Sequence, residues 1–406
     1  MNIIEGGITA PKGFLATGEH VGVKKVKKDL AIIYSEKPAL CSAVFTKNLV
    51  KAPPLWWCEK LVKEKQKIQA IVINSGNANA CTGDRGYQDA LAMAETLSEC
   101  LHIKKESVLV TSTGVIGVYL PMDKIIPGIK ETSKTLGADE KSAKRCAKAI
   151  MTTDTFRKEI AVEIEIKGKK VKLAGIAKGS GMIHPNMATM LGFITTDINI
   201  SQELLDKAFK ENINDSFNMI TVDGETSTND MAVILANGLA ENPVVDKEDE
   251  DYEKFKTALD YITKYLAKQI VKDGEGATKF LECQIFNAKS KEEARVLCKA
   301  ILNSNLVKTA FFGNDANWGR VLSAMGASGI DFDPNQVKIS FKNDKGEIKL
   351  FENGLPVEFD EDFAFKILKQ EEVKILIDMN RGMESITGWG CDLSFDYVKI
   401  NAEYRT

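Results

Sequence analysis

The sequence has few histidines and no closely spaced pair of cysteines, the residues that most often bind zinc. Three histidines, His20, His102 and His184, occur in 406 residues, and none opens an H-E-x-x-H motif. The eight cysteines include no C-x-x-C pair. Zinc sites draw on these two residue types at short spacings, so no metal centre is expected. The scattered thiols favour reduced cysteines, and hence a cytoplasmic protein, over a disulfide framework.

Long apolar runs and an excess of basic charge are also missing. No apolar run approaches the roughly 18 residues that span a bilayer, and the first ten residues carry Glu5 and two glycines where a signal peptide has a basic and then an apolar stretch. The net charge of −3 argues against nucleic acid as a partner. The motifs of a P-loop, a hydrolase nucleophile elbow and a Ser-Lys pair are absent as well.

The sequence does have the length and composition of a large globular protein. At roughly 150 residues per domain, 406 residues predict two to three structural units. Strand-like and helix-like stretches alternate, which favours a mixed α/β architecture. Strands are expected at 67–74 and 107–111, and a hairpin at 160–177 with its turn at 167–170. Helices are expected at 88–101, 201–212, 251–271, 291–302 and 360–370.

The two halves of the chain carry opposite charge. Residues 1–188 hold 29 Lys and Arg against 19 Asp and Glu, a net +10, whereas residues 189–406 hold 25 against 38, a net −13. The simplest explanation for most of this difference is an uneven distribution of charged side chains over the protein surface. A functional interpretation is that the halves attract each other and would stay together if the chain were cut between them.

The segment 178–193, KGSGMIHPNMATMLGF, is the most unusual stretch of the chain. One interpretation is a buried strand entered through a glycine-containing loop, in which Thr189 is one more β-branched strand residue. A second interpretation makes Thr189 a nucleophile that is activated by its own α-amine after the Ala188-Thr189 peptide bond is broken. A free α-amine has a reference pKa near about 8 and can take the hydroxyl proton at neutral pH.

Acyl transfer through Thr189 would need donors for the developing oxyanion, and the stretch 110–117, VTSTGVIG, supplies candidates. The Thr113 hydroxyl and the Gly114 amide follow a predicted strand, and one such donor is typically worth roughly 3 to 4 kcal/mol of barrier. A plain glycine-containing loop is the alternative. The nearby stretch 74–83, NSGNANACTG, suits either a tight turn system or the wall of a polar pocket.

Other polar clusters fall on short stretches that conventional turns would explain one by one. Together they supply cations, carboxylates and amides suited to a small zwitterionic ligand. They lie at 152–154, 223–230, 273–276, 313–320 and 401–406.

With these residues in view, the sequence resembles the ornithine acetyltransferase family of arginine biosynthesis, whose members include bifunctional glutamate/ornithine acetyltransferases. The resemblance runs from GGITAPKG at 6–13, through KGSGMIHPNMATML at 178–191, to YRT at 404–406. It implies an αββα-type layered sandwich resembling the N-terminal nucleophile hydrolases. It also implies self-cleavage between Ala188 and Thr189 into an α chain, 1–188, and a β chain, 189–406.

The resemblance assigns roles to individual residues. Thr189 is implied as the nucleophile, and Thr113 and Gly114 as the oxyanion donors. The substrate contacts it implies are Thr152, Lys178, Thr189, Glu275, Asn401 and Thr406, with Thr153 as an alternative to Thr152. A carboxylate such as Glu275 suits a substrate ammonium, and Lys178 with the Asn401 amide suits an α-carboxylate.

The implied reaction is a ping-pong transfer of acetyl from N2-acetylornithine to glutamate, with small-molecule substrates and no cofactor. The resemblance leaves open whether acetyl-CoA is a second acetyl donor. The implied assembly pairs two αβ units as an α2β2 heterotetramer. The rival enzyme class is an amidohydrolase or aminopeptidase with the same nucleophile, in which water removes the acyl group. A non-enzymatic alternative is an uncleaved two-domain protein that binds amino acids.

Overall fold

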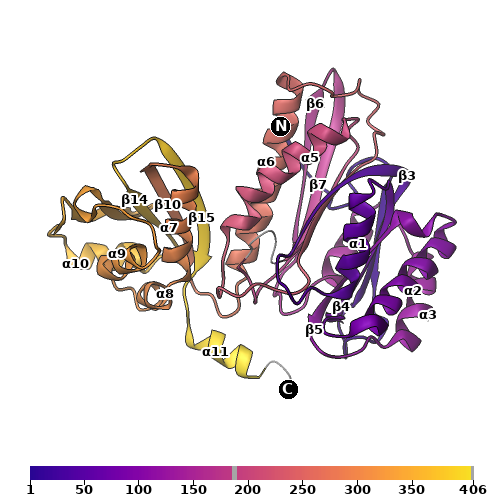
Figure 1. Ribbon diagram of the computed structural model, residues 1–406, viewed down its shortest axis with the longest axis horizontal. Helices are drawn as coiled ribbons and strands as arrows, with labels where there is room; N and C mark the ends of the chain where they lie inside the picture. Colours follow the sequence, from indigo (N-terminus) through magenta and orange to yellow (C-terminus); the bar gives the residue numbers. More distant parts are fainter. Residues whose placement is uncertain (185–189, 404–406) are drawn as a thin grey trace. The chain divides into compact units, whose positions relative to one another are not determined.

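The computed structural model describes residues 1–184 and 190–403, which form two compact units (Figure 1). Unit 1 holds Met1–Gly179, the described part of 185–218, and Thr226–Ile270. Unit 2 holds Ser180–His184, Met219–Glu225 and Val271–Thr406, the last as far as it is described. No helix among the described residues is both long and apolar enough to cross a membrane.

Unit 1 is built on a nine-stranded sheet. Its strands run in the order β1-β6-β7-β8-β9-β3-β4-β5, and β2 pairs with β3 beside that path. The strands are β1 (Asn2–Ile4), β2 (Phe14–Glu19), β3 (Leu30–Phe45), β4 (Ile68–Asn77), β5 (Val108–Val115), β6 (Lys158–Ile166), β7 (Lys169–Lys178), β8 (Leu191–Thr196) and β9 (Met231–Ala236).

The long strand β3 divides this sheet into two layers. Its first part, Leu30 to Tyr34, pairs with β2 and β4, and its last part, Leu40 to Phe45, pairs with β9 after a break in register. One hydrophobic core joins residues of β7, β8 and β9 with residues of β3, β4 and β5. The sheet therefore folds over its own apolar face.

Helices cover the outer faces of both layers. In Figure 1, α6 (Glu250–Lys272) lies beside β6 and β7, while α1 (Pro53–Lys63) and α2 (Gly83–Leu101) lie beside β4 and β5. Helix α5 (Gln202–Asn214) packs on β3, and α3 (Met122–Ser133) packs on α2, β2 and β3. The remaining helix, α4 (Glu140–Ala149), packs on β2 and β3. This arrangement confirms the predicted layered α/β fold.

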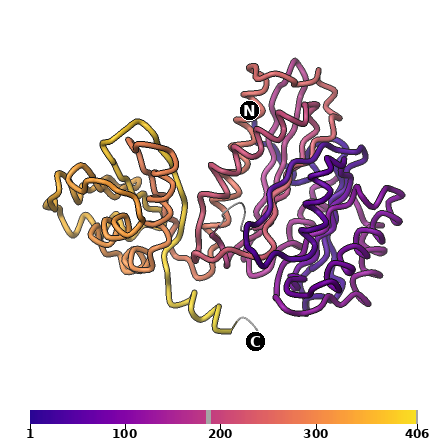
Figure 2. The backbone as a smooth tube through the Cα atoms, viewed as in Figure 1, coloured from indigo at the N-terminus to yellow at the C-terminus, as the bar shows by residue number. Residues whose placement is uncertain are grey.

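Unit 2 is a smaller α/β layer with a six-stranded sheet in the order β13-β12-β11-β14-β10-β15. Its strands are β10 (Phe280–Ala288), β11 (Lys338–Asn343), β12 (Gly346–Glu352), β13 (Leu355–Pro356), β14 (Glu372–Asp378) and β15 (Glu384–Cys391). Its helices are α7 (Lys291–Asn303), α8 (Asn305–Phe312), α9 (Trp318–Gly326), α10 (Glu361–Leu368) and α11 (Phe395–Ala402). The tube in Figure 2 follows the chain from β15 into α11.

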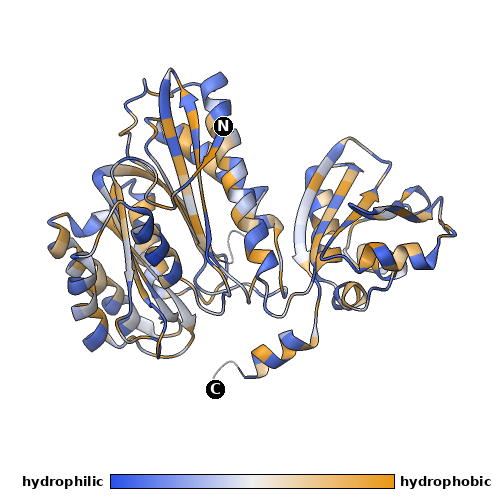
Figure 3. Cartoon of the chain, turned by 180° about the vertical axis from the view of Figure 1, so that it is seen from behind, coloured by the Kyte–Doolittle hydropathy of each residue, from blue (hydrophilic) through white to orange (hydrophobic). Residues whose placement is uncertain are grey.

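Every element predicted from the sequence is present in the structure. The hairpin is β6 and β7, and its two-residue turn has positive φ at Lys167 (49°) and Gly168 (74°), the geometry that matches the twist of the two strands. Among the described residues there are also three short 3-10 helices, Lys105–Ser107, Phe217–Met219 and Pro334–Gln336. The helices carry polar and apolar residues together in Figure 3, as amphipathic covering helices do.

Candidate active site

The predicted oxyanion residues lie where two parallel strands of unit 1 end. In the β4–β5 register Ser75 faces Thr113 and Gly76 faces Gly114. A Cβ atom on Gly114 would lie 2.3 Å from the backbone carbon of Gly76, and Gly114 has φ +136°. Glycine is therefore required here because two backbones approach closely. The two polar stretches that the sequence analysis treated separately are neighbours.

The stretch 74–83 forms a tight turn system held by its own side-chain hydrogen bonds. Asn74 accepts from the Ser112 hydroxyl at 2.6 Å and donates to the Asn77 carbonyl at 2.8 Å. The Asn77 amide donates to the Val118 carbonyl at 3.1 Å. These amide side chains satisfy backbone groups at the strand ends.

Lys178, the last residue of β7, joins two of the predicted site residues. Its ammonium donates to the hydroxyl oxygens of Thr113 and Thr152, each at 3.1 Å. Thr113 is 8% exposed and Lys178 is 9% exposed. Because the Thr113 oxygen accepts from Lys178, its own hydrogen is left to donate to a different acceptor. Thr152 rather than Thr153 makes this contact with Lys178.

The buried carboxylate of Asp154 lies next to the Lys178 cluster. Asp154 pairs with Lys158 at 2.7 Å, and both side chains are fully buried. It also accepts from the backbone N–H groups of Gly179 at 2.8 Å and Thr152 at 2.9 Å. Burial alone would raise the pKa of Asp154, but the nearby charges of Lys158 and Lys178 and the hydrogen bonds lower it to about 2. Asp154 therefore fixes the backbone on both sides of the cluster.

A second buried acid belongs to the loop that precedes β9. Asp230 is 2% exposed, and burial raises its pKa well above the usual range although Lys178 opposes the shift. Within the described residues, its Oδ2 atom has no hydrogen-bond partner. The adjacent Asn229 donates to the carbonyls of Ala78 and Ser112 at 2.5 and 2.9 Å. The loop 226–230 is thereby attached to the ends of β4 and β5.

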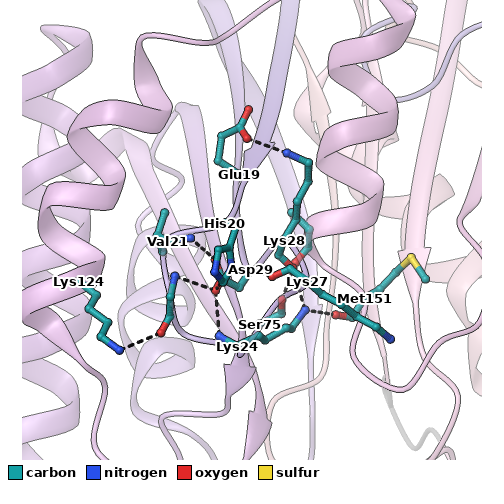
Figure 4. A network of polar contacts seen from close by, with 12 residues as sticks. Glu19, His20, Val21, Lys24, Lys27, Lys28, Asp29, Ser75, Lys124 and Met151 are labelled. Atoms are coloured by element: carbon teal, nitrogen blue, oxygen red, sulfur yellow. Dashed lines mark hydrogen bonds and ion pairs between the residues drawn. The ribbon is translucent and has the colours of Figure 1, made fainter.

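Figure 4 shows a basic loop that contacts Met151, the residue before Thr152. The buried Asp29 accepts from the backbone N–H groups of Val21, Gly22 and Lys24 at 2.7, 3.1 and 2.9 Å. The Lys24 ammonium donates to the carbonyls of Lys28 at 3.0 Å and Met151 at 2.5 Å. Burial first, and then the charge of Lys178, lower the pKa of Lys24 to about 8 despite the opposing effect of Asp29.

In unit 2 the structure brings Glu275 and Asn401 together. The Asn401 amide donates to Glu275 Oε2 at 2.9 Å and to the Tyr397 carbonyl at 3.1 Å. A Cβ atom on Gly181 would lie 2.2 Å from Glu275 Oε2, so a side chain at this position would require the Glu275 carboxylate to move. Both amide hydrogens of Asn401 are engaged within unit 2, so in this arrangement Asn401 orients Glu275.

Hydrogen bonds within unit 2 hold the segment 180–184, which precedes the predicted cleavage point in the sequence. Asp223 accepts from the backbone N–H groups of Met182 at 2.6 Å and Ile183 at 2.8 Å. His184 Nδ1 lies 3.1 Å from the Asn303 side-chain nitrogen. Burial first, and then the positive charge of Lys299, lower the pKa of His184 to about 4, so its imidazole is neutral near pH 7.

Three of the predicted residues, Ala188, Thr189 and Thr406, lie outside the described residues. Of the others, Thr113, Gly114, Thr152 and Lys178 belong to unit 1, and Glu275 and Asn401 belong to unit 2. Lys158 and Lys24 were not predicted as site residues. For Lys158 a signal existed, because the alternation of buried residues 160, 162 and 164 extends to 158 at the same period of two.

Comparison with known proteins gives full-length matches. The ArgJ family model matches residues 15–406. The chain is 54% identical over 406 residues to the arginine biosynthesis bifunctional protein ArgJ of Caldanaerobacter subterraneus subsp. tengcongensis, with 100% of both chains covered. It is 52% identical over 397 residues to the protein of the same name from Thermotoga neapolitana, covering 98% of this chain and 99% of the relative.

Among solved structures, the chain is similar to the arginine biosynthesis bifunctional protein argJ of Bacillus halodurans. The identity is 46% and the TM-score is 0.44, with 46% of this chain and 98% of that chain covered.

Proposed function

The chain belongs to the ArgJ family and is an acetyltransferase of arginine biosynthesis, and we propose that it moves the acetyl group of N2-acetylornithine to glutamate through Thr189. The observation that carries this proposal is the full-length match at 54% identity, with both chains covered completely. The cluster of Lys178, Thr113 and Thr152 supports it from the structure. Thr189 stands two positions before Leu191 in the sequence, and Leu191 is the cross-strand partner of Lys178.

The first half-reaction forms an ester on Thr189. The Thr189 hydroxyl attacks the acetyl carbonyl, its proton passes through the α-amine to the departing nitrogen, and the amide C–N bond breaks to release ornithine. The Thr113 hydroxyl and the Gly114 amide are proposed to donate to the oxyanion. Lys178 helps because its ammonium fixes the Thr113 oxygen and leaves the Thr113 hydrogen for that donation.

The second half-reaction regenerates the hydroxyl. The α-amine of glutamate attacks the acetyl ester, a new C–N bond forms, the C–O bond to Thr189 breaks, and the proton returns to the Thr189 oxygen. Glu275 is proposed to bind a substrate ammonium, with Asn401 as the residue that orients it. Thr152 and Lys178 are proposed as contacts to substrate, together with Thr406.

We also propose that the chain cuts itself between Ala188 and Thr189 and that its two fragments stay together as parts of an α2β2 assembly in the cytoplasm. Strand pairing supports the association of the fragments. β7 of the proposed α chain pairs with β8 of the proposed β chain, and β3 pairs with β9 in the same way. Two fragments that share one sheet would separate only if these strand pairs were broken.

The test compares acetyl transfer with acetyl release. Purified protein is given N2-acetylornithine with and without glutamate, and N-acetylglutamate and free acetate are measured. We expect N-acetylglutamate to form at a rate far above that of acetate. If acetate dominates with glutamate present, the protein is an amidohydrolase. A single band near 44.7 kDa on a denaturing gel, together with no acetyl transfer, would favour the alternative of an uncleaved protein that binds amino acids.

A further inference from the structure

Asp230 differs from four other buried aspartates in the hydrogen bonds that it makes. It is 2% exposed, and within the described residues its Oδ2 atom has no hydrogen-bond partner. Buried polar atoms in proteins are nearly always hydrogen-bonded. Both carboxylate oxygens accept hydrogen bonds in the other four, Asp29, Asp154, Asp197 and Asp392. The unpaired oxygen of Asp230 therefore points to a donor beyond those that the described residues supply.

The loop that carries Asp230 is fixed at several points. The Ala52 N–H donates to the Thr228 carbonyl at 2.9 Å, and the Thr46 N–H donates to the backbone carbonyl of Asp230 at 3.0 Å. The Thr46 hydroxyl donates to the Ser227 carbonyl at 2.8 Å. Because these bonds hold the backbone on the N-terminal side of β9, the loop keeps the carboxyl group of Asp230 inside the protein.

Strand pairing places Asp230 beside the residue that follows Thr189. β8 and β9 are parallel with Leu191 opposite Met231, and the Met231 N–H donates to the Met190 carbonyl at 3.0 Å. Asp230 immediately precedes Met231, and Thr189 immediately precedes Met190. Consecutive Cα atoms are about 3.8 Å apart and neighbouring strands about 4.8 Å. An α-amine on residue 189 can therefore reach the Asp230 carboxylate.

Burial and one nearby cation determine the charge of Asp230 while residue 189 is still part of a peptide bond. Burial raises the pKa of Asp230 well above its usual range. Hydrogen bonds from Ser227 and Thr46 lower this pKa, as does the charge of Lys178 from β7, but burial has the largest effect. The protonated, neutral carboxyl group is therefore favoured before the cut, whereas an ammonium ion beside it would favour the carboxylate.

We propose that Asp230 is a positioning residue for the Thr189 α-amine: its Oδ2 atom accepts a hydrogen bond from this amine once the Ala188-Thr189 peptide bond has been cut. The proton that the Asp230 carboxyl group holds before the cut passes to the new amine, which leaves a carboxylate beside an ammonium ion. This inference rests on the proposed function, because it assigns a partner to the base of the proposed nucleophile.

In the transfer reaction Asp230 keeps its negative charge. The ammonium ion first loses a proton to solvent, and the neutral α-amine then takes the proton of the Thr189 hydroxyl as the C–O ester bond forms. The Asp230 carboxylate stabilises the ammonium ion produced in this step, until its proton passes to the departing ornithine nitrogen. Asp230 thereby makes the α-amine a stronger base.

The test is the pH dependence of kcat/KM for N2-acetylornithine in the cut protein, unaltered and with Asp230→Asn. The acid limb of this profile reports the pKa of the base in the free enzyme. A neighbouring carboxylate raises the pKa of an ammonium ion, so its removal lowers that pKa. We expect the acid limb of Asp230→Asn to move to lower pH by about one pH unit or more. The plateau should fall roughly tenfold or more, because a weaker base takes the hydroxyl proton less readily.

Asp197→Asn is the matched control. Asp197 is 3% exposed, burial raises its pKa too, and it follows β8 at the opposite end from Thr189. Damage to the fold from the loss of a buried carboxylate should therefore appear in both variants, whereas a change in the basicity of the α-amine should appear in one. We expect Asp197→Asn to keep the acid limb of the unaltered protein. An acid limb that is unmoved in Asp230→Asn, or that moves equally in Asp197→Asn, would overturn the proposal.

Infrared spectroscopy tests the same inference if Asp230→Asn fails to fold, because it distinguishes a protonated carboxyl group from a carboxylate. Thr189→Ala keeps the chain uncut and serves as the reference for the state before cleavage. We expect the difference spectrum between this uncut variant and the cut, unaltered protein at pH 7 to show one protonated carboxyl group that becomes a carboxylate. A difference spectrum without this change would contradict the role of Asp230.

These measurements separate this inference from the proposed function. Absence of cutting or of acetyl transfer in the unaltered protein contradicts the proposed function, whereas normal transfer with an unmoved acid limb in Asp230→Asn contradicts only the role of Asp230.

Discussion

Two threonines on β5 allow the oxyanion role to be tested with a matched control. Thr113→Val removes the proposed donor at nearly constant volume, and we expect kcat to fall by roughly 10²- to 10³-fold. Thr113→Ser keeps the hydroxyl and should recover most of the rate. Thr111 is fully buried and, among the described residues, its hydroxyl has no partner. Thr111→Val should therefore leave kcat within about twofold and stability equal or slightly higher. A loss confined to KM in Thr113→Val would assign Thr113 to substrate binding.

The pair of Asp154 and Lys158 is expected to dominate the local stability of the site. Asp154→Asn leaves the fully buried Lys158 ammonium without its carboxylate, which should lower the free energy of unfolding by roughly 3–5 kcal/mol. The double variant Asp154→Asn/Lys158→Met removes both charges and should recover part of that loss. Urea unfolding followed by circular dichroism measures both. An unchanged midpoint in Asp154→Asn would show that the pair contributes nothing.

The lowered pKa of Asp154 predicts that the stability of the protein depends on pH. The pKa of Asp154 is lowered from 3.8 to about 2 in the folded protein, so its stabilising effect is present above about pH 4 and is lost as the pH falls toward 2. A difference of this size corresponds to about 2 kcal/mol. The gap in unfolding free energy between the unaltered protein and Asp154→Asn should narrow by that amount between pH 5 and pH 2. A constant gap over this range would contradict the shift.

Several site residues could be identified from the sequence, whereas others could be recognised only from the three-dimensional structure. Thr113, Gly114 and Lys178 stand out by residue type and by family resemblance. The strand, helix and strand at 67–74, 88–101 and 107–111 also indicate a parallel pair, which places the strand ends together. The burial of Asp154 depends on contacts between residues far apart in sequence, so composition alone cannot predict it.

The elements most readily predicted were those with clear periodicity. The hairpin β6–β7 and helix α6 follow alternating and helical apolar patterns closely. In contrast, β3 contains Glu36, Lys37 and Pro38, which interrupt its apolar pattern, and the structure accommodates them where the register shifts between Tyr34 and Ala39. Helix α4 was also missed, because its buried face consists of small residues such as Ala143 and Cys146 rather than large apolar ones.

Strand pairing and charge make different predictions for the association of the two proposed fragments. The fragments 1–188 and 189–406 have opposite net charges of +10 and −13, and they also share the β7–β8 and β3–β9 pairs. Because salt screens charge but leaves strand pairs and the apolar core intact, we expect the fragments to elute together from a sizing column in 1 M NaCl. Dissociation at that salt concentration without denaturant would show that charge attraction holds them together.

The whole molecule combines a layered unit 1, which carries the Lys178 cluster, with a unit 2, which carries Glu275. The proposed cut would fall between two strands of one sheet, β7 and β8, and would give Thr189 a free α-amine two residues before β8 begins. The match to the ArgJ proteins covers residues of both units. Activity should therefore require residues 1–188 and 189–406 together.

The proposed mechanism depends most directly on an acetyl group held by Thr189. The decisive measurement is intact mass spectrometry of the purified protein before and after mixing with N2-acetylornithine, with peptide mapping of the modified site. We expect two fragments that begin at Met1 and Thr189, one added acetyl mass on the fragment that begins at Thr189, and its removal by glutamate. An acetyl group mapped to another residue, such as Lys178 or Cys391, or an active chain that is never cut, would contradict the account.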